Sequence, residues 1–270
     1  MLRRSVLASV VLAMLLPACS SGDPVPSVTR GEDPAAPTAP SGPTGPTAEP
    51  TAEPPSRIER TVQAIASGEG DFVVVPRVRY VPMWKRLGPQ DADYAFDTRH
   101  PDGGPTPMLI ADAEVDPRGD AWFQVYLPIR PNGSTGWVRA DDVRVQERHD
   151  RLEVDLSKRT LEHYRDGELV DRFRVGVGTD QYPTGTGTFY VWVKVPFANP
   201  NQPYGIMALG LSGFSPVISD WPGEGRMAVH GTPYASNRGQ EVSHGCVRVY
   251  NPDMETLVDL PLGTPVIIRR

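Results

Sequence analysis

The chain has 270 residues, of which 39% are hydrophobic and 30 are prolines. Proline is roughly twice as frequent as in an average protein, so we expect part of the chain to lie outside any globular domain. The formal net charge is −6 at pH 7 and no part of the chain is basic, which argues against a nucleic-acid partner.

Residues 1–18 have the features of a secretory signal peptide. Arg3 and Arg4 give a charged start, and an apolar run follows that is too short to span a bilayer. The sequence Leu16-Pro17-Ala18-Cys19-Ser20 resembles a lipobox, the bacterial cleavage site at which the cysteine becomes the lipidated first residue. We therefore expect a lipid anchor on Cys19, which would hold the protein on the extracytoplasmic face of the cell membrane, in the periplasm or cell wall. An ordinary secretory cleavage near Ala18 is the alternative.

Residues 19–56 are predicted to be a disordered tether. They consist mainly of Pro, Thr, Ala, Gly, Ser and Glu, and such a segment buries too little apolar surface to offset its ordering entropy. Directly after it, Ile58, Val62 and Ile65 recur at helical spacing, which predicts one short helix within 57–70.

Short β-like runs broken by Pro and Gly fill the rest of residues 57–149. They predict a small β-barrel domain, with strands at 72–75, 79–81, 108–110, 121–127 and 136–139. The ending Gly136-Trp137-Val138, followed by Asp141 and Asp142, resembles the closing strand of a bacterial SH3-like domain. That resemblance implies wall binding, and a rigid spacer or a lid over a neighbouring site is equally compatible.

Residues 150–270 are predicted to form a second, mostly β domain. Asp166-Gly167 between two apolar runs predicts a hairpin, and further strands are expected at 152–156, 173–177, 190–195, 226–230, 246–249 and 266–268. Residues 196–225 are predicted to be one long loop, and Asn251 and Pro252 suit the start of a helix that runs to about Asp259. His100, His149 and His163 are expected at the surface.

Cys246 is the one cysteine in a segment that is predicted to fold. Gly245 precedes it and removes a side chain where a substrate backbone would approach. His230 and His244 are near in sequence, so a nucleophilic sulfur with a histidine base is the simplest functional interpretation. An inert buried Cys246 is the structural alternative.

The segment from His230-Gly231-Thr232 to Ser243-His244-Gly245-Cys246-Val247-Arg248 resembles the active-site signature of the L,D-transpeptidases, which remodel bacterial peptidoglycan. Pro183-Thr184-Gly185, ahead of Phe189, resembles a further element of that family. The resemblance implies a β-sandwich catalytic domain with a short helix. It also implies a reaction in which Cys246 forms a thioester with a peptidoglycan stem peptide, releases D-alanine and passes the acyl group to an acceptor amine.

The resemblance implies roles for particular residues. Cys246 is the expected nucleophile and His230 the general base and acid, with the Gly231 carbonyl as a candidate to orient its ring. His244 is left open between substrate binding, loop shaping and proton transfer, and Arg248 between a stem carboxylate and a structural ion pair. Ser243 is expected to shape the turn, the backbone N–H groups of Gly245 and Cys246 to face the oxyanion, and the rings of Tyr204 and Trp221 to contact the donor peptide.

Two other functions stay open from the sequence. A peptidoglycan-cleaving cysteine peptidase is disfavoured because His230 precedes Cys246, the reverse of the usual order, and a non-catalytic wall-binding lipoprotein is disfavoured by the intact signature. No metal is expected, because His230, His244 and Cys246 lack a fourth zinc ligand at a recognisable spacing. We expect no cofactor, a monomer, and stem peptides and the membrane as partners.

Overall fold

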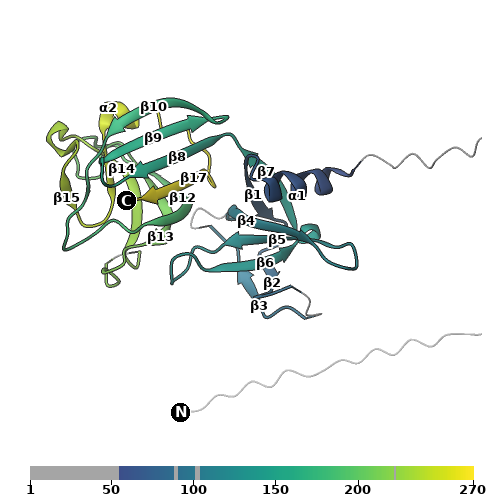
Figure 1. Cartoon of the computed structure of the whole chain (residues 1–270). Coiled ribbons are helices and arrows are strands. Elements are labelled where there is room, and N and C mark those ends of the chain that lie inside the picture. The colour runs from purple at the N-terminus through teal and green to yellow at the C-terminus, as the bar shows by residue number, and fades with distance from the viewer. Residues whose placement is uncertain (1–54, 88–90, 101–103, 222) are drawn as a thin grey trace, which may run out of the picture. The chain divides into compact units, whose positions relative to one another are not determined.

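The computed structural model describes residues 55–87, 91–100, 104–221 and 223–270, and most of their regular structure is β-strand (Figure 1). The prediction of a mostly β protein is confirmed. The expected signal peptide, the lipidation site Cys19 and the tether up to residue 54 lie outside the described residues.

Helix α1 spans Arg57–Ser67, three residues less than the predicted segment. Ser56 caps its start, since the Ser56 hydroxyl accepts from the Glu59 N–H and the Glu59 carboxylate accepts from the Ser56 N–H. The helix ends at Gly68, whose φ of 73° is a conformation that glycine adopts without steric cost. Val62 is buried against the sheet that follows, as its spacing predicts.

The N-terminal lobe, which follows this helix, contains a five-stranded sheet in the order β6-β5-β4-β1-β7. The hairpin of β2 and β3 extends this sheet at its β6 edge. Trp84, directly after β2, exchanges two backbone hydrogen bonds with Trp137 of β6. The bounds are β1 Asp71–Pro76, β2 Tyr80–Met83, β3 Tyr94–Asp97, β4 Met108–Val115, β5 Ala121–Tyr126, β6 Thr135–Arg139, a 3-10 turn Ala140–Asp142 and β7 Val143–Arg148.

The C-terminal lobe is built on an eight-stranded sheet in the order β10-β9-β8-β17-β12-β13-β14-β16. Leu161 of β9 and Val249 of β16 lie near opposite ends of this order and still belong to one buried core, so the sheet curves around that core. The bounds are β8 Asp150–Asp155, β9 Thr160–Arg165, β10 Glu168–Arg174, β12 Gly187–Pro196, β13 Met207–Phe214, β14 Arg226–Thr232, β16 Val247–Tyr250 and β17 Pro265–Arg269; the short strands β11 Val177–Gly178 and β15 Glu241–Ser243 pair separately.

The prediction of one loop over residues 196–225 is wrong, because β13 runs through its middle. Gly210 and Gly213 weaken the β-pattern of this strand in the sequence, but its packing requires them. A Cβ at Gly213 would lie 2.2 Å from the ring of Phe189, and one at Gly210 would lie 2.6 Å from Val193. The strand therefore tolerates no side chain at these positions.

The predicted helix after β16 is also shorter than expected. Helix α2 spans Asn251–Met254, with Tyr250 rather than Asn251 as its N-cap. The chain continues to residue 259 in turns, where Leu257 N–H donates to Met254 at a spacing of three residues.

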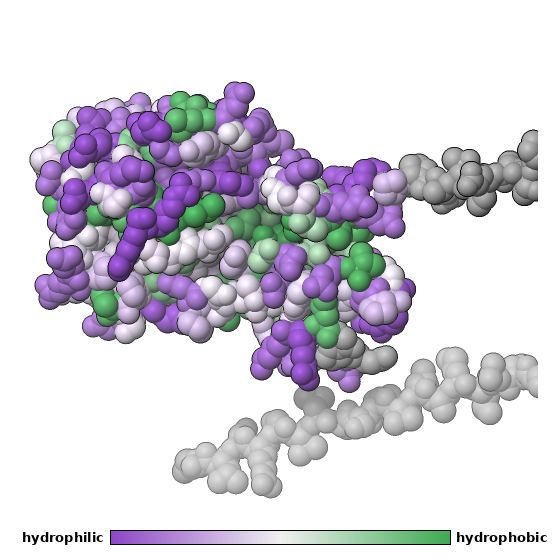
Figure 2. Space-filling model, in the orientation of Figure 1, coloured by the Kyte–Doolittle hydropathy of each residue, from purple (hydrophilic) through white to green (hydrophobic). Residues whose placement is uncertain are grey.

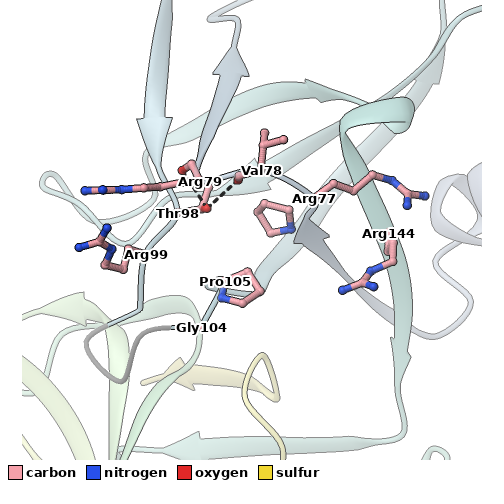
Figure 3. A pocket seen from close by; sticks show the side chains of 9 residues that line it. Arg77, Val78, Arg79, Thr98, Arg99, Gly104, Pro105 and Arg144 are labelled. Atoms are coloured by element: carbon pink, nitrogen blue, oxygen red, sulfur yellow. Dashed lines mark hydrogen bonds between the residues drawn. The ribbon is translucent and has the colours of Figure 1, made fainter.

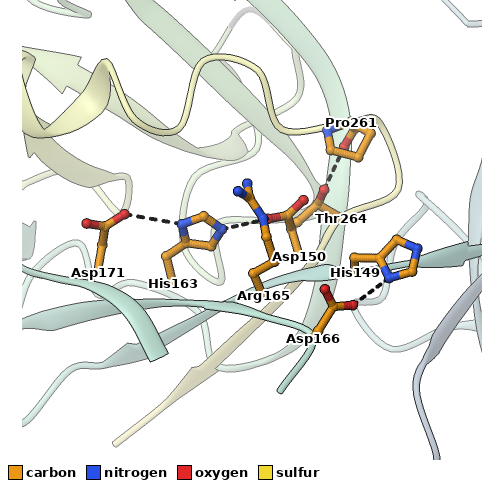
Figure 4. Close-up of polar contacts among 8 residues, drawn as sticks. All are labelled: His149, Asp150, His163, Arg165, Asp166, Asp171, Pro261 and Thr264. Carbon is orange, nitrogen blue, oxygen red and sulfur yellow. Dashed lines mark hydrogen bonds and ion pairs between the residues drawn. The ribbon is translucent and has the colours of Figure 1, made fainter. Parts of the chain in front are cut away.

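Two of the three histidines predicted at the surface are buried, which corrects that prediction. His163 is 1% exposed and lies between Asp150, at 2.8 Å, and Asp171, at 3.5 Å, in the polar cluster of Figure 4. His100 is 3% exposed, and its Nε2 lies 2.7 Å from the carbonyl of Trp192. His163 was expected at the surface because of its charged neighbours, but carboxylates can satisfy a buried imidazole. His100 was expected there because it lies in loop sequence, but a backbone carbonyl of the other lobe satisfies it. His149 is exposed, as predicted.

The two lobes share buried contacts along β12. Tyr190 and Trp192 of this strand pack against the core of the N-terminal lobe, and the bond from His100 to Trp192 joins the lobes as well. The described residues of both lobes form one compact unit. The boundary expected at residues 149 and 150 stays a prediction.

The surface of the described part is mostly polar. Hydrophilic residues cover most of the face in Figure 2, and hydrophobic residues form small separate groups on it. Among the described residues, no helix has the length and apolar character needed to cross a membrane.

Candidate active site

Cys246 and His230 come from neighbouring strands of the C-terminal sheet. β14 and β16 are parallel, with Val229 opposite Val247 and His230 opposite Arg248. Cys246 immediately precedes β16, so its side chain lies beside the strand that carries His230. His230 lies within β14, which continues to Thr232, rather than at the end of a strand as expected.

Both side chains line one cavity of about 350 Å³. His230 is 3% exposed, whereas Cys246 is partly exposed. The fully buried cysteine of the structural alternative is therefore not seen, although burial still affects the Cys246 thiol. The other predicted residues on this cavity are Tyr204, Trp221, Ser243, His244, Gly245 and Arg248.

The imidazole of His230 is held in one tautomer. Its Nδ1 lies 2.7 Å from the Gly231 carbonyl, which only accepts, so Nδ1 carries the proton and Nε2 is left as an acceptor. This hydrogen bond is the one expected from the sequence. Gly231 is itself fixed by close packing, because a Cβ there would lie 2.6 Å from Asn251 Oδ1 and 3.0 Å from the Ile206 nitrogen.

Burial keeps both groups neutral at pH 7. Desolvation lowers the pKa of His230 to about 4, with the Arg248 charge acting in the same direction and the Gly231 hydrogen bond opposing it. Burial also raises the pKa of the Cys246 thiol, against a backbone hydrogen bond with Ala228 and the Arg248 charge. At pH 7 the cavity thus holds a neutral thiol and a neutral imidazole rather than a thiolate and an imidazolium.

Ser243 shapes the turn before Cys246, as predicted. Its hydroxyl donates to the Cys246 carbonyl at 2.6 Å and accepts from the Gly245 N–H at 3.1 Å. Gly245 has a φ of 115°, which only glycine adopts without strain. Since the Gly245 N–H is bound to Ser243, the prediction that it faces an oxyanion is wrong, and the Cys246 N–H is the remaining donor of that pair.

The cavity thus brings Cys246 and His230 of the sequence signature to one place, and a family comparison covers the same part of the chain. Residues 149–268 match the YkuD family, the L,D-transpeptidase catalytic domain. The resemblance stated from the sequence is thereby confirmed for this domain, which contains both Cys246 and His230.

Two curated relatives carry the YkuD name and are assigned as L,D-transpeptidases. The protein from Bacillus licheniformis is 34% identical over 119 residues, which cover 44% of this chain and 64% of that protein. The protein from Bacillus subtilis strain 168 is 29% identical over 120 residues, which cover 44% of this chain and 65% of that protein. The chain thus spans slightly less than two thirds of the length of these relatives.

Solved L,D-transpeptidase structures also match. An L,D-transpeptidase from Mycobacterium tuberculosis H37Rv is 17% identical, covers 61% of this chain and 90% of that chain, and gives a TM-score of 0.40.

Arg248 lies inside the matched L,D-transpeptidase domain, next to the candidate nucleophile. Its Nη1 donates to Asn237 Oδ1 at 3.2 Å, while its Nε is buried without a hydrogen-bond partner among the described residues. None of the ion pairs found among the described residues includes Arg248, so the structural ion pair that the sequence left open is not what holds it. A buried guanidinium nitrogen at the cavity is suited to an anionic ligand.

Aromatic rings surround both histidines of the site. Tyr204 lies 4.9 Å from the ring of His230, and the exposed His244 lies between Tyr182, at 4.6 Å, and Trp221, at 5.1 Å. His244 is therefore part of an aromatic rim. This arrangement favours substrate binding or loop shaping over the proton-transfer role that was the third alternative.

Several cavity residues escaped the sequence analysis. Ser215, Ile218, Arg226 and Met227 line the cavity from the loop after β13 and from the start of β14. Tyr182, which packs on His244 but does not line the cavity, escaped as well, although it directly precedes the recognised Pro183-Thr184-Gly185 element. None of these residues belongs to the sequence signature, so only the fold could identify them.

Proposed function

We propose that the chain is an L,D-transpeptidase that acts on peptidoglycan stem peptides through a thioester on Cys246. The observation that carries this proposal is the shared cavity of Cys246 and His230, with Nδ1 of His230 bound to Gly231 so that Nε2 is an acceptor. A thiol and an imidazole acceptor, arranged in this way, can perform nucleophilic acyl transfer.

The first half of the proposed reaction forms the thioester. Nε2 of His230 accepts the thiol proton as the sulfur attacks the carbonyl of the third stem residue, and the C–N bond to the terminal D-alanine then breaks. The imidazolium returns the proton to the leaving amine. Because burial strongly disfavours a charged His230, the imidazolium is short-lived and returns its proton readily.

The second half transfers the acyl group. An acceptor amine, from another stem peptide, attacks the thioester carbonyl and gives its proton to Nε2, and the sulfur leaves and recovers a proton from the imidazolium. The Cys246 N–H is the donor that we assign to the oxyanion in both halves.

We assign the recognition of the donor to the rest of the cavity. Arg248 is suited to a stem carboxylate, because its Nε is buried without a partner among the described residues and its planar fork fits that group. Tyr204, Trp221 and His244 lie at the rim and offer rings to the peptide backbone. Gly231 and Ser243 support His230 and Cys246.

Incubation with a disaccharide tetrapeptide tests this function. We expect mass spectrometry to detect loss of alanine together with a crosslinked dimer, and neither product with Cys246→Ala. Free stem fragments without dimers would favour the cysteine peptidase, and binding without any reaction would favour the wall-binding protein. A carbapenem is expected to add covalently to wild-type Cys246 and to leave Cys246→Ala unmodified.

We also propose that the mature protein is anchored to the extracytoplasmic face of the membrane through a lipid on Cys19, and that it acts as a monomer. The lipobox-like sequence at residues 16–20 supports the anchor. Metabolic labelling with a fatty acid tests it: label on the wild-type chain and none on Cys19→Ala is the expected result. An unlabelled wild-type chain would contradict it.

For the N-terminal lobe we propose an SH3-like domain that binds the cell wall. A hollow of about 540 Å³ supports this, because four arginines line it and no acidic residue among those that the structure describes does (Figure 3). One of the four, Arg79, is paired with Asp97. The other three, Arg77, Arg99 and Arg144, suit the acidic groups of a wall polymer.

Sedimentation with purified cell walls measures this binding. Arg77→Ala with Arg144→Ala is expected to release most of the protein at low salt, and Arg172→Ala, an exposed arginine of the other lobe, is expected to release none. Equal retention of the wild-type protein, the double variant and Arg172→Ala on the walls would contradict the assignment of the hollow as the wall-binding site.

A further inference from the structure

The loop between β5 and β6 of the N-terminal lobe is bonded to the loop that follows β13 in the C-terminal lobe. The side-chain amide of Asn132 makes two hydrogen bonds to the backbone of Phe214. It donates to the Phe214 carbonyl at 2.7 Å and accepts from the Phe214 N–H at 2.8 Å. Asn132 thus fixes the last residue of β13 in the way a neighbouring strand would.

Arg130, two residues earlier, binds the loop that starts there. Its guanidinium donates to the carbonyls of Ser215 at 3.1 Å, Ile218 at 2.8 Å and Glu224 at 2.7 Å. These acceptors lie at both ends of residues 215–224, which we name the β13–β14 loop. A planar guanidinium has five N–H donors in a fixed arrangement, so one side chain holds the two ends of this loop together.

The same loop forms one wall of the candidate active site. Ser215, Ile218 and Trp221 all line the cavity that contains Cys246. Trp221 lies 5.1 Å from the ring of His244, and a Cβ at Gly245 would lie 3.8 Å from Ser215 Oγ. The loop therefore contacts the turn that presents the sulfur.

Further hydrogen bonds stabilise the loop internally, and Arg226 connects its end to the N-terminal lobe. The Ser215 hydroxyl accepts from the N–H groups of Val217, at 3.3 Å, and Ile218, at 3.1 Å. Arg226, which follows the loop, stacks on Trp192 at 3.9 Å and on Phe214 at 4.3 Å, and its side chain reaches the Pro128 carbonyl of the N-terminal lobe. The wall of the cavity is thus fixed from the other lobe at both of its ends.

We infer that Arg130 and Asn132 are positioning residues for the active site: the N-terminal lobe clamps the β13–β14 loop against the Cys246 turn and so shapes the donor-peptide groove. This inference deepens the proposed function and rests on it for its kinetic readout. Neither residue lines the cavity, so their effect reaches the substrate through the loop. Misplacing a groove wall by a small distance is enough to reduce turnover strongly.

The test compares Arg130→Ala, Arg130→Lys and Asn132→Ala with Arg86→Ala, because Arg86 is an exposed arginine of the same lobe and lines neither the cavity nor the arginine-lined hollow. Rates of D-alanine release are divided by the amount of folded protein, measured by tryptophan fluorescence, so that unfolded protein does not count. We expect Arg130→Ala to raise KM for the tetrapeptide about tenfold or more, with a smaller loss in kcat. Lysine cannot reach three carbonyls at once, so Arg130→Lys is expected to restore less than half of the loss. Arg86→Ala is expected to stay within twofold of wild type.

A second measurement does not depend on catalysis. Limited proteolysis with the glutamate-specific protease Glu-C, mapped by mass spectrometry, is expected to cut after Glu224, an exposed residue of the loop, at least fivefold faster in Arg130→Ala and Asn132→Ala than in Arg86→Ala. Unchanged cutting together with an unchanged KM would overturn the clamp. If the wild-type chain releases no D-alanine, the proposed function fails, and the rate of cutting after Glu224 alone decides whether the two residues hold the loop.

Discussion

His230→Ala is expected to lower the rate of D-alanine release by about 10²- to 10⁴-fold, the usual contribution of a general base and acid. The reason is that both the Cys246 thiol and the His230 imidazole are neutral at pH 7. The pKa of the Cys246 thiol is raised by burial, so almost no thiolate exists at pH 7 without an acceptor, and Nε2 of His230 is the acceptor that the Gly231 hydrogen bond leaves available. Steady-state kinetics with the tetrapeptide measure the loss.

The dependence on pH separates this role from a merely structural one. At high pH the thiol of the variant ionises by itself, so the difference between His230→Ala and wild type is expected to shrink as the pH rises above the raised pKa of Cys246. His149→Ala serves as the matched control, because His149 is exposed and does not line the cavity. A loss that stays the same at every pH, or a loss of less than tenfold at pH 7, would argue that His230 is not the base.

The sequence predicted the reactive residues of the site better than the residues that line the rest of the cavity. Cys246, His230, Ser243 and Gly231 lie in one short signature, and β14 and β16 pair in parallel within that window, so identity and spacing were sufficient to bring them together. The Gly231 hydrogen bond to His230 was predictable for the same reason, since the acceptor is the next residue in the chain.

The clamp could not be predicted from the sequence. Arg130 and Asn132 are more than 80 positions from Ser215 and Phe214, and the groups that they bind are backbone carbonyls and an N–H, which every residue has. The buried His163 was missed for a related reason, because Asp150 and Asp171 lie on separate strands and only the sheet brings them to its ring. Patterns in the sequence indicate which residues are apolar, but not which polar residues satisfy one another inside the fold.

The folded chain is expected to lose stability in acid because of the same imidazole. The pKa of His230 is about 4 in the folded protein, and an unfolded histidine titrates near 6.5. Between these values the unfolded chain binds the proton and the folded chain does not, so stability is complete above pH 6.5 and falls as the pH drops towards 4. The difference corresponds to about 3 kcal/mol, which is a large part of the stability of a typical domain.

Denaturant unfolding at several pH values between 7.5 and 4 checks this loss, with His230→Gln as the comparison. Glutamine does not titrate, so the variant is expected to have a lower stability at pH 7 and a flatter dependence on pH, and the two curves should converge towards pH 4. All other titratable groups are the same in both proteins, so their contributions cancel in the difference. Parallel curves would mean that His230 is accessible to protons in the folded chain, which would contradict the neutral thiol and imidazole pair on which the proposed mechanism depends.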